Sequence, residues 1–535
     1  MKEKLKKNNK IVFVLVCILV ISAFFRFFHI STWLFWGMDQ EYEAFLVKNI
    51  MTGKHFPLIG VNAADTGLYL GPIFIYLASI PFLLFSGNPL GWAISASVIG
   101  VFVTYLVYRV GKVMFSETAG LFGSLIYASS FLISFYDRQF WNPMPIPFFS
   151  LIIGFFLYKI INNNQKVLLW LFLSLGVAVQ CHLSILIFLP LIIFVIWKKY
   201  KIFSKKILLF SLGIFLITQL PVITFELKHN FINTKSAITL IKNPSANTNI
   251  LSTWKDRNEI FISTLGRIFF VPSPADLFVE SGQCKELLAY KRNAYPEEFF
   301  FIAFAILVFI FWYISSRKNV KSKSIQKNRS SIIIVGGIFV STIFFVELYG
   351  RSFFEYYFLF LFPWLAIVLG KSFEFLWQKK HGYIIVIPVI SFFILLNFIS
   401  MLNASYSYSY ANKLAAINFA KNNLAGKRYS LEALGECPRF GGYRYLFEYY
   451  FKKPHSSYMD SYFAWLYGNK SENDFSIYKE GKNIVLLSLI DSRMDQESIS
   501  KWEKIKLPYL IDYNIIKEQR FGRIEVFILA SKRSK

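Results

Sequence analysis

The stretch YLGPIFIYLASIPFLLFS, residues 69–86, decides how this chain is folded. It is long and apolar enough to cross a bilayer. It also contains Gly71, Pro72 and Pro81, which are typical of a broken or interfacial helix. Whether this stretch crosses the membrane decides on which side of the membrane every later loop lies. The rest of the sequence discriminates between the two arrangements.

The composition of the chain indicates a membrane protein. Its 535 residues are 55% hydrophobic and 19% aromatic, and only 17% are charged. A soluble protein carries about 25% charged residues. Runs of about 17–25 apolar residues, the length of a transmembrane helix, recur along the chain. The clear ones cover residues 11–28, 90–108, 119–136, 143–158, 207–225, 299–316, 331–349, 353–370 and 382–402. Two shorter runs, 167–181 and 183–197, are expected to form a tight helical hairpin around Cys181-His182. We therefore predict an all-α polytopic membrane protein with about 11 spans and additional juxtamembrane helices.

The net charge of +26 raises the question of nucleic-acid binding. The positions of the charges argue against that partner, because Lys and Arg concentrate between the apolar runs. Five lie in residues 1–10, five in 198–206 and six in 317–329, and the last two segments contain no acidic residue. This distribution is the positive-inside bias of cytoplasmic loops.

The basic segments also indicate whether the stretch 69–86 crosses the membrane or lies at its surface. If that stretch crossed the membrane, the segments 1–10, 198–206 and 317–329 could not all face the cytoplasm. If it lies at the outer surface, all of them do. We therefore expect a multi-pass protein of the plasma membrane with a cytoplasmic N-terminus, in which the loops 31–89 and 226–298 face outward.

The last part of the chain differs from the rest. Residues 1–402 form the predicted transmembrane domain, whereas residues 403–535 are more polar. In this tail, NIVLLSLI (483–490) and RIEVFILA (523–530) have the pattern of strands, and ANKLAAINFAKNNLAGK (411–427) has that of a helix. We expect residues 403–535 to form a small extracytoplasmic α/β domain.

Three carboxylates follow the first apolar run, in WGMDQEYEAFLVKNIMTG (36–53). At about 100° per residue, Asp39 and Glu43 share one side of a helix and Glu41 points elsewhere. A carboxylate at a dry interface can have a raised pKa and act as a general base. The alternative is an amphipathic interfacial helix with a solvated acidic face.

Polar side chains also occur at the predicted outer ends of other spans. An Arg beside Trp, Asn and Pro in YDRQFWNPMP (136–145) could bind an anion, although an Arg at a span end also snorkels to headgroups. A charge at a span entrance marks function by default, although a structural ion pair gives the same pattern. The candidates are Arg138, Asn142, His182, Arg267, Tyr349, Arg351 and Glu355.

The order of these motifs resembles the GT-C superfamily of membrane glycosyltransferases, in particular glycosyltransferase family 39. That family is related to the protein O-mannosyltransferases and the lipid A aminoarabinose transferases. The resemblance covers roughly residues 1–400. It rests on MDQEYEAFLVKNIMTGKHFPLIG (38–60), GLYLGPIFIYL (67–77), YRVGKVMFSETAGLFGSLIYASS (108–130), DRQFWNPMPIPFFSL (137–151), VQCHLSILIFLP (179–190) and EYYFLFLFP (355–363).

The resemblance implies transfer of a sugar from a polyprenyl-phosphate donor to an extracytoplasmic glycan, lipid or protein acceptor. Asp39 matches the first acid of the family's Asp-Glu motif and is the expected catalytic base. Three positions depart from the family pattern: Gln40 replaces the second acid, Asn142 replaces the Asp of an Asp-Pro pair, and Gly71-Pro72 replaces a Lys/His-Pro-Pro motif. These departures leave the sugar and the acceptor open.

The chemistry of this reaction assigns expected roles to the candidate residues. The leaving lipid phosphate is already anionic, so it needs cations rather than a general acid. The expected phosphate contacts are Arg138, Arg267 and Arg351. The expected substrate contacts are Gln40, Glu43, Tyr69, Asn142, His182, Tyr349 and Glu355. A single in-line displacement inverts the anomeric carbon. We predict no cofactor and no obligatory metal, because a monophosphate demands less neutralisation than a diphosphate, although a divalent cation is compatible with the site.

Three other functions remain open at the level of sequence. The chain could be a polymerase or ligase of diphosphate-linked glycans, which has no obvious need for the acidic motif at 36–53. It could be a lipid-glycan transporter or flippase, which needs charged or broken helices within the bilayer. It could also be an inactive accessory subunit, in keeping with the substitutions at Gln40 and Asn142.

The predicted topology can be tested by thiol labelling. An Asn88→Cys variant should react in intact cells with a membrane-impermeant reagent added outside, because position 88 follows the stretch that does not cross. Reaction only after the cells are opened would contradict this topology.

Overall fold

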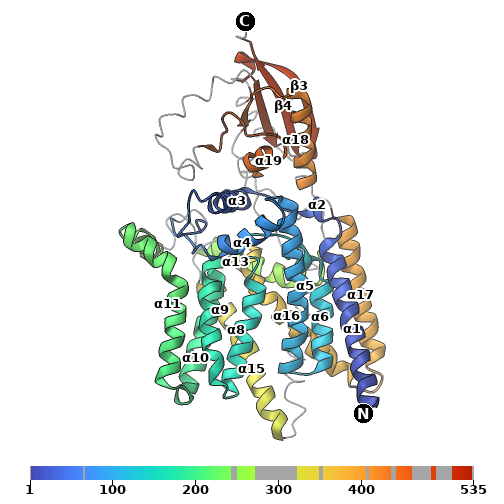
Figure 1. Cartoon of the computed structure of the whole chain (residues 1–535). Coiled ribbons are helices and arrows are strands. Elements are labelled where there is room, and N and C mark those ends of the chain that lie inside the picture. The colour runs from blue at the N-terminus through green and yellow to red at the C-terminus, as the bar shows by residue number, and fades with distance from the viewer. Residues whose placement is uncertain are drawn as a thin grey trace.

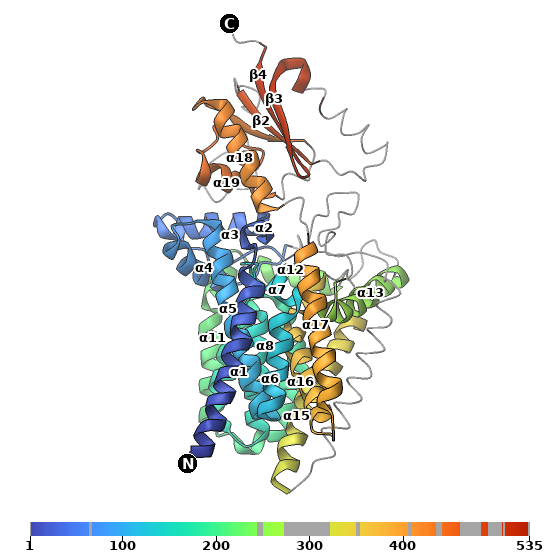
Figure 2. The same ribbon diagram turned by 90° about the vertical axis from the view of Figure 1, so that its right-hand side faces the viewer.

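The computed structural model describes residues 2–63, 67–242, 250–271, 322–348, 354–404, 409–434, 441–460, 483–489, 506 and 509–532. Figure 1 shows a bundle of long helices with a small domain, which contains a β-sheet, at one end. The N-terminal end of α1 lies at the opposite end of the bundle, as the second view also shows (Figure 2).

The bundle is built from helices that run between its two ends. They are α1 (Lys2–Phe27), α5 (Pro89–Met114), α6 (Glu117–Ser129), α8 (Ile146–Ile161), α9 (Leu168–Cys181), α10 (Leu189–Lys199), α11 (Lys205–Lys228), α15 (Ser322–Leu348), α16 (Phe362–Trp377) and α17 (Tyr383–Asn403). The shorter elements are α2 (Ile30–Trp33), α3 (Met38–Met51), α4 (Ile73–Leu84), α7 (Phe131–Tyr136), α12 (Ile232–Lys242), α13 (Ile250–Phe269) and the 3-10 helices η1 (Gln165–Val167), η2 (Leu183–Phe188), η3 (Tyr200–Ile202) and η5 (Glu355–Leu361).

The helices have the length and composition of a multi-pass membrane protein. Within the described ranges, 7 helices are long and apolar enough to cross a membrane, and three shorter apolar helices accompany them. The predicted span 299–316 lies outside the described residues. The number of about 11 spans therefore stays a prediction.

Turns that carry the predicted cytoplasmic segments meet at one end of the bundle. Lys199 Nζ donates to Asn163 Oδ1 at 2.7 Å. Ser330 Oγ and Asn162 Oδ1 are 3.2 Å apart. This is the end that lies away from the sheet (Figure 1). The meeting of these turns at one end agrees with the prediction that the basic segments share one side of the membrane. The assignment of this end to the cytoplasm stays a prediction.

Within the stretch 69–86, only Ile73–Leu84 form a helix, α4, which has 12 residues. A helix of that length is about 18 Å long, too short to cross an apolar layer of roughly 30 Å. Figures 1 and 2 place α4 beside α3, at the end of the bundle near the sheet. The expectation that this stretch does not form a span therefore agrees with the structure.

The run 119–136 was expected to form one span, and its helix is interrupted in the structure. Helix α6 ends at Ser129, Ser130 is extended, and α7 begins at Phe131. Asn397 of α17 repairs this break, because its Oδ1 accepts from Phe131 N at 2.8 Å. Broken helices are tolerated at such depth when neighbouring side chains bind the freed backbone groups.

The domain at the end of the chain contains the four described strands, in the order β1-β2-β4-β3. They are β1 (Ser430–Ala433), β2 (Asn483–Leu489), β3 (Tyr513–Phe521) and β4 (Ile524–Ser531), with helices α18 (Tyr410–Leu424) and α19 (Tyr443–Tyr450). The predicted strands 483–490 and 523–530 and the predicted helix 411–427 are confirmed as β2, β4 and α18. β1 pairs in parallel with β2, and the other two pairings are antiparallel.

A buried ion pair joins α1 to the turn that follows α7. Arg26 Nη2 and Asp137 Oδ2 are 2.6 Å apart, and the Arg26 side chain is fully buried. Arg26 Nη1 also donates to Ser22 Oγ at 2.8 Å, and Arg26 Nη2 donates to the carbonyl of Tyr127 at 3.3 Å. These bonds satisfy a charge that would be expensive to bury alone.

The domain with the sheet contacts α3 through buried polar groups. Tyr445 N donates to Glu41 Oε1 at 2.6 Å, and Lys413 Nζ donates to the carbonyl of Trp36 at 2.5 Å. Glu41 is completely buried, contrary to the alternative of a solvated acidic face. Burial raises the pKa of Glu41 to about 8, opposed by the bond from Tyr445 and by the charge of Arg444.

The shifted pKa of Glu41 predicts that this contact depends on pH. Between the usual value of 4.5 and about 8, the folded carboxyl keeps a proton that the unfolded carboxyl has lost. Stability should therefore fall as pH rises through this window, by at most about 1.4 kcal/mol per pH unit. Glu41→Gln keeps the acceptor for Tyr445 N and has no proton to lose.

The melting temperature in detergent should therefore rise in Glu41→Gln relative to the unchanged protein, and this difference should grow between about pH 5 and pH 8. Glu117→Gln, at the opposite end of the bundle, serves as the control and should show no such trend. A constant difference across this pH range for Glu41→Gln would contradict the buried, protonated carboxyl.

Candidate active site

The helix that carries the acidic motif begins at Met38, directly after extended Gly37. Gln40 Oε1 accepts from Gly37 N at 3.0 Å, so Gln40 closes the first turn of α3 as in a capping box. Glu and Gln are both suited to this capping role. Gln40 was expected to contact the substrate. In the structure its side-chain oxygen instead caps the N-terminus of α3.

The three carboxylates of α3 lie in different surroundings. Asp39 is exposed. Glu43, one turn later, is completely buried, and neither of its carboxylate oxygens makes a hydrogen bond of normal geometry. Burial, and next the charge of Asp39, raise the pKa of Glu43 well above its usual range, opposed by the backbone amide of Asn142. As expected, Glu41 points elsewhere, toward the domain with the sheet.

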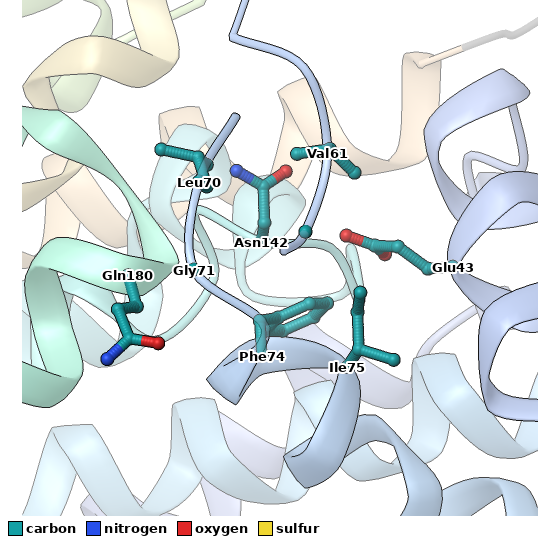
Figure 3. A pocket seen from close by; sticks show the side chains of 9 residues that line it. Glu43, Val61, Leu70, Gly71, Phe74, Ile75, Asn142 and Gln180 are labelled. Atoms are coloured by element: carbon teal, nitrogen blue, oxygen red, sulfur yellow. The ribbon is translucent and has the colours of Figure 1, made fainter. Parts of the chain in front are cut away.

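Glu43 lines a small pocket. Figure 3 shows the carboxyl of Glu43 across the pocket from Asn142, with Gln180 on the far side of Gly71. The other lining residues come from the segment before α4 and from α4 itself: Gly60, Val61, Leu70, Phe74 and Ile75. The pocket is therefore formed by residues far apart in the sequence.

The segment between α3 and α4 folds back on itself beside this pocket. Gly60 N donates to the carbonyl of Leu70 at 2.7 Å, and Leu70 N donates to that of Val61 at 2.9 Å. A Cβ at Gly60 would lie 2.6 Å from the carbonyl oxygen of Gly71, which is too close. Glycine at position 60 thus permits the close approach of the two arms.

Tyr69, an expected substrate contact, is held in this segment through its backbone. Tyr69 N donates to Asn233 Oδ1 at 2.6 Å, and Asn233 Nδ2 donates to the carbonyl of Tyr69 at 2.8 Å. Asn233 belongs to α12, in the loop 226–298 that was expected to face outward. This loop therefore contributes to the position of one wall of the pocket.

Asn142 and His182 are brought together by the ends of α7 and α9. Asn142 Nδ2 donates to the carbonyl of Cys181 at 3.0 Å. His182 Nδ1 lies 2.8 Å from Ser184 Oγ and 3.3 Å from Ser184 N. Burial lowers the pKa of His182 to about 4, so the ring is neutral at pH 7.

Aromatic rings surround His182. Its ring centroid lies 5.7 Å from that of Tyr356 and 5.4 Å from that of Tyr357. Trp141 contacts Tyr356 edge to face, with 4.7 Å between the ring centroids. Trp141 precedes the pocket residue Asn142, so this aromatic cluster adjoins the pocket. Such rings can pack against the faces of sugars.

The expected phosphate contacts have different surroundings. Arg267 Nη1 and Glu355 Oε1 form a buried ion pair at 2.6 Å, and Tyr136 Oη donates to Glu355 Oε2 at 2.9 Å. Arg138 is fully buried and donates to the carbonyl of Phe25. Burial, and next the charge of Arg26, lower the pKa of Arg138 to about 9, so it remains a cation at pH 7.

The described candidates lie at the same end of the bundle, on α3 and on the turns around Asn142, His182 and Glu355. Tyr349 and Arg351 lie outside the described residues. Sequence reasoning did not identify Gln180, whose position beside Gly71 depends on two distant segments. The sequence did contain a signal for the ion pair of Arg26, because a charged residue inside an apolar run needs a specific partner.

No group of three or more His, Cys, Asp or Glu side chains in the described ranges could hold a metal ion. The expectation that the reaction needs no obligatory metal continues to rest on the chemistry of a monophosphate leaving group.

Comparison by sequence identifies one family. Residues 70–225 match the family described as dolichyl-phosphate-mannose-protein mannosyltransferase. The matched region runs from the segment before α4 to α11 and contains Gly71, Asn142 and Gln180. No curated protein sequence matches the chain.

Comparison by structure covers nearly the whole chain. The fold is similar to that of ArnT from Cupriavidus metallidurans bound to undecaprenyl phosphate, with a TM-score of 0.59, 10% identity and 98% of both chains covered. It is also similar to the archaeal oligosaccharyltransferase AglB from Archaeoglobus fulgidus, in complex with an inhibitory peptide and a dolichol-phosphate. That match has a TM-score of 0.50 and 12% identity, and it covers 98% of this chain and 75% of AglB. The resemblance to the GT-C superfamily is thereby confirmed, and the chain has the GT-C fold.

Proposed function

We propose that this protein transfers a sugar from a polyprenyl-phosphate carrier to an acceptor outside the cytoplasm. The observation that carries the proposal is the position of Asp39 and Glu43. They lie on a helix outside the spans, at the end of the bundle where the pocket and the aromatic cluster adjoin. An enzyme with one lipid-borne substrate and one soluble or surface substrate needs polar groups at this boundary.

The two acids of α3 are suited to different tasks. Asp39 is exposed, and we assign it the role of the base that accepts the proton of the attacking acceptor hydroxyl. Glu43 is buried beside it, and burial with the charge of Asp39 keeps its carboxyl protonated. Divergent environments of two neighbouring acids are typical of sites that separate acid and base roles.

The donor phosphate requires positive charge at the same end of the bundle. Arg138 and Arg267 are buried there, and we assign them to the electrostatic stabilisation of the departing lipid phosphate, together with Arg351. Arg267 would then share its charge between Glu355 and the phosphate. The leaving group is an anion of low basicity, so the proposed reaction is a single displacement with inversion at the anomeric carbon.

The comparisons support the class of donor. The matched family is named for dolichyl-phosphate-mannose. The two similar structures contain undecaprenyl phosphate and a dolichol-phosphate. All three names refer to a long isoprenoid chain on a phosphate. We therefore propose the same class of carrier for this protein and a glycan, lipid or protein as its acceptor.

Asp39→Asn tests the proposed chemistry. The purified protein would be incubated with a panel of polyprenyl-phosphate sugars, and released polyprenyl phosphate would be measured with and without a cell-envelope extract as the acceptor source. The unchanged protein should release lipid phosphate from at least one donor. Asp39→Asn should lower that rate by about 10²–10⁴-fold, because a positioned general base contributes an effect of this size.

Glu117→Gln is the matched control, since it neutralises a carboxylate at the opposite end of the bundle and should leave the rate unchanged. Full turnover by Asp39→Asn would remove Asp39 as the base. Release of a lipid diphosphate would favour a polymerase or ligase, and movement of the intact donor across a vesicle membrane without release would favour a flippase.

A further inference from the structure

The pocket beside Glu43 contains buried polar groups whose hydrogen bonding is incomplete. Glu43 is 0% exposed and Gln180 is 2% exposed. The backbone amide of Asn142 lies near the carboxyl of Glu43, but neither carboxyl oxygen makes a hydrogen bond of normal geometry, and Gln180 Oε1 makes none. Native proteins leave few buried polar groups unsatisfied, and two such side chains on one pocket indicate a site for a ligand.

The orientation of Gln180 is fixed by backbone carbonyls. Its Nε2 donates to the carbonyl of Thr218 at 2.5 Å and to that of Gly176 at 3.4 Å. Rotation of the amide by 180° would place Oε1 against these two oxygens. Gln180 therefore holds Oε1 toward the pocket, as Figure 3 shows, and presents only an acceptor there.

Asn142 is oriented in the same way. Its Nδ2 donates to the carbonyl of Cys181 at 3.0 Å, so its Oδ1 is left for the pocket. The glycine at position 71 is required for this arrangement, because a Cβ there would overlap the side chain of Gln180. One amide from the turn after α7 and one from α9 thus line the same pocket as the carboxyl of Glu43.

The amide oxygens of Asn142 and Gln180 require hydrogen-bond donors from a ligand, whereas the protonated carboxyl of Glu43 can both donate and accept. A fully ionised phosphate group offers no donor to the two amide oxygens, whereas a sugar hydroxyl can donate one hydrogen bond, can accept others and is neutral. We propose that Glu43, Asn142 and Gln180 form a subsite that binds hydroxyl groups of the donor sugar. This inference rests on the proposed function and assigns Gln180 as a residue that determines sugar specificity.

The position of α4 favours the donor over the acceptor. Phe74 and Ile75 of α4 line the pocket. The other side of the same helix exposes apolar residues, among them Ile80 at 59% and Leu84 at 72%. In a chain that lies in a bilayer, this apolar surface faces lipid tails. A sugar carried by a lipid can therefore reach the pocket from the side of α4.

Gln180→Leu tests the subsite in the full-length protein. Once the panel above has identified a donor, single deoxy analogues of that sugar would be compared with the parent donor by kcat/KM. The unchanged protein should prefer the parent over at least one analogue by about tenfold, the size of one hydrogen bond to a buried group. Gln180→Leu should lower kcat/KM for the parent by about tenfold and leave that analogue unaffected.

Gln219→Leu is the matched control, because Gln219 also donates to the carbonyl of Gly176, at 2.9 Å, and does not line the pocket. It should keep the preference for the parent sugar. Gly71→Ala provides a second test, since the added methyl occupies the space beside Gln180 Oε1. It should also abolish the preference. Binding of bare polyprenyl phosphate should be equal in all variants and shows that they are folded.

The proposal is overturned if Gln180→Leu lowers kcat/KM equally for the parent and every deoxy analogue, or changes neither. It is also overturned if the variant alters only the KM for the acceptor, because the pocket would then bind the acceptor. Failure of the unchanged protein to use any lipid-phosphate sugar would instead refute the proposed function.

Discussion

The ion pair between Arg26 and Asp137 is the interaction on which the end of the bundle near the sheet depends. An Arg in an apolar helix has to be paired, since an isolated charge in a medium of low polarity is very costly. Its partner Asp137 opens the turn that carries Arg138, Gln139 and Asn142. Gln139 Oε1 in turn accepts from Phe35 N at 2.8 Å, just before α3 begins. The pair thereby fixes the start of α3 relative to Asn142.

Helix α3 connects two parts of the molecule through carboxylates two residues apart. Glu41 accepts from Tyr445 N of the domain with the sheet, and Glu43 lines the pocket. Because a helix is rigid over one turn, a displacement of that domain would move Glu43 and Asp39 as well. The domain at the end of the chain therefore contributes to the geometry of the candidate site without lining the pocket.

The short helix α4 separates lipid from the pocket. Its apolar composition suits both of its sides. One side exposes apolar residues to the surrounding lipid, and the other contributes Phe74 and Ile75 to the pocket. The polar groups of the pocket come from α3, α9 and the turn after α7, where backbone carbonyls orient the amides of Asn142 and Gln180.

The sequence by itself determined the class of protein and most of its helices, because apolar run length and the positions of Lys and Arg are local properties that the membrane enforces. It also separated Glu41 from Asp39 and Glu43, since helical geometry is local. Only the tertiary structure decided which acids are buried, because Glu41 meets Tyr445, 404 residues away in the sequence. Gln180 likewise acquires its role from Gly71 and Thr218, which folding alone brings beside it.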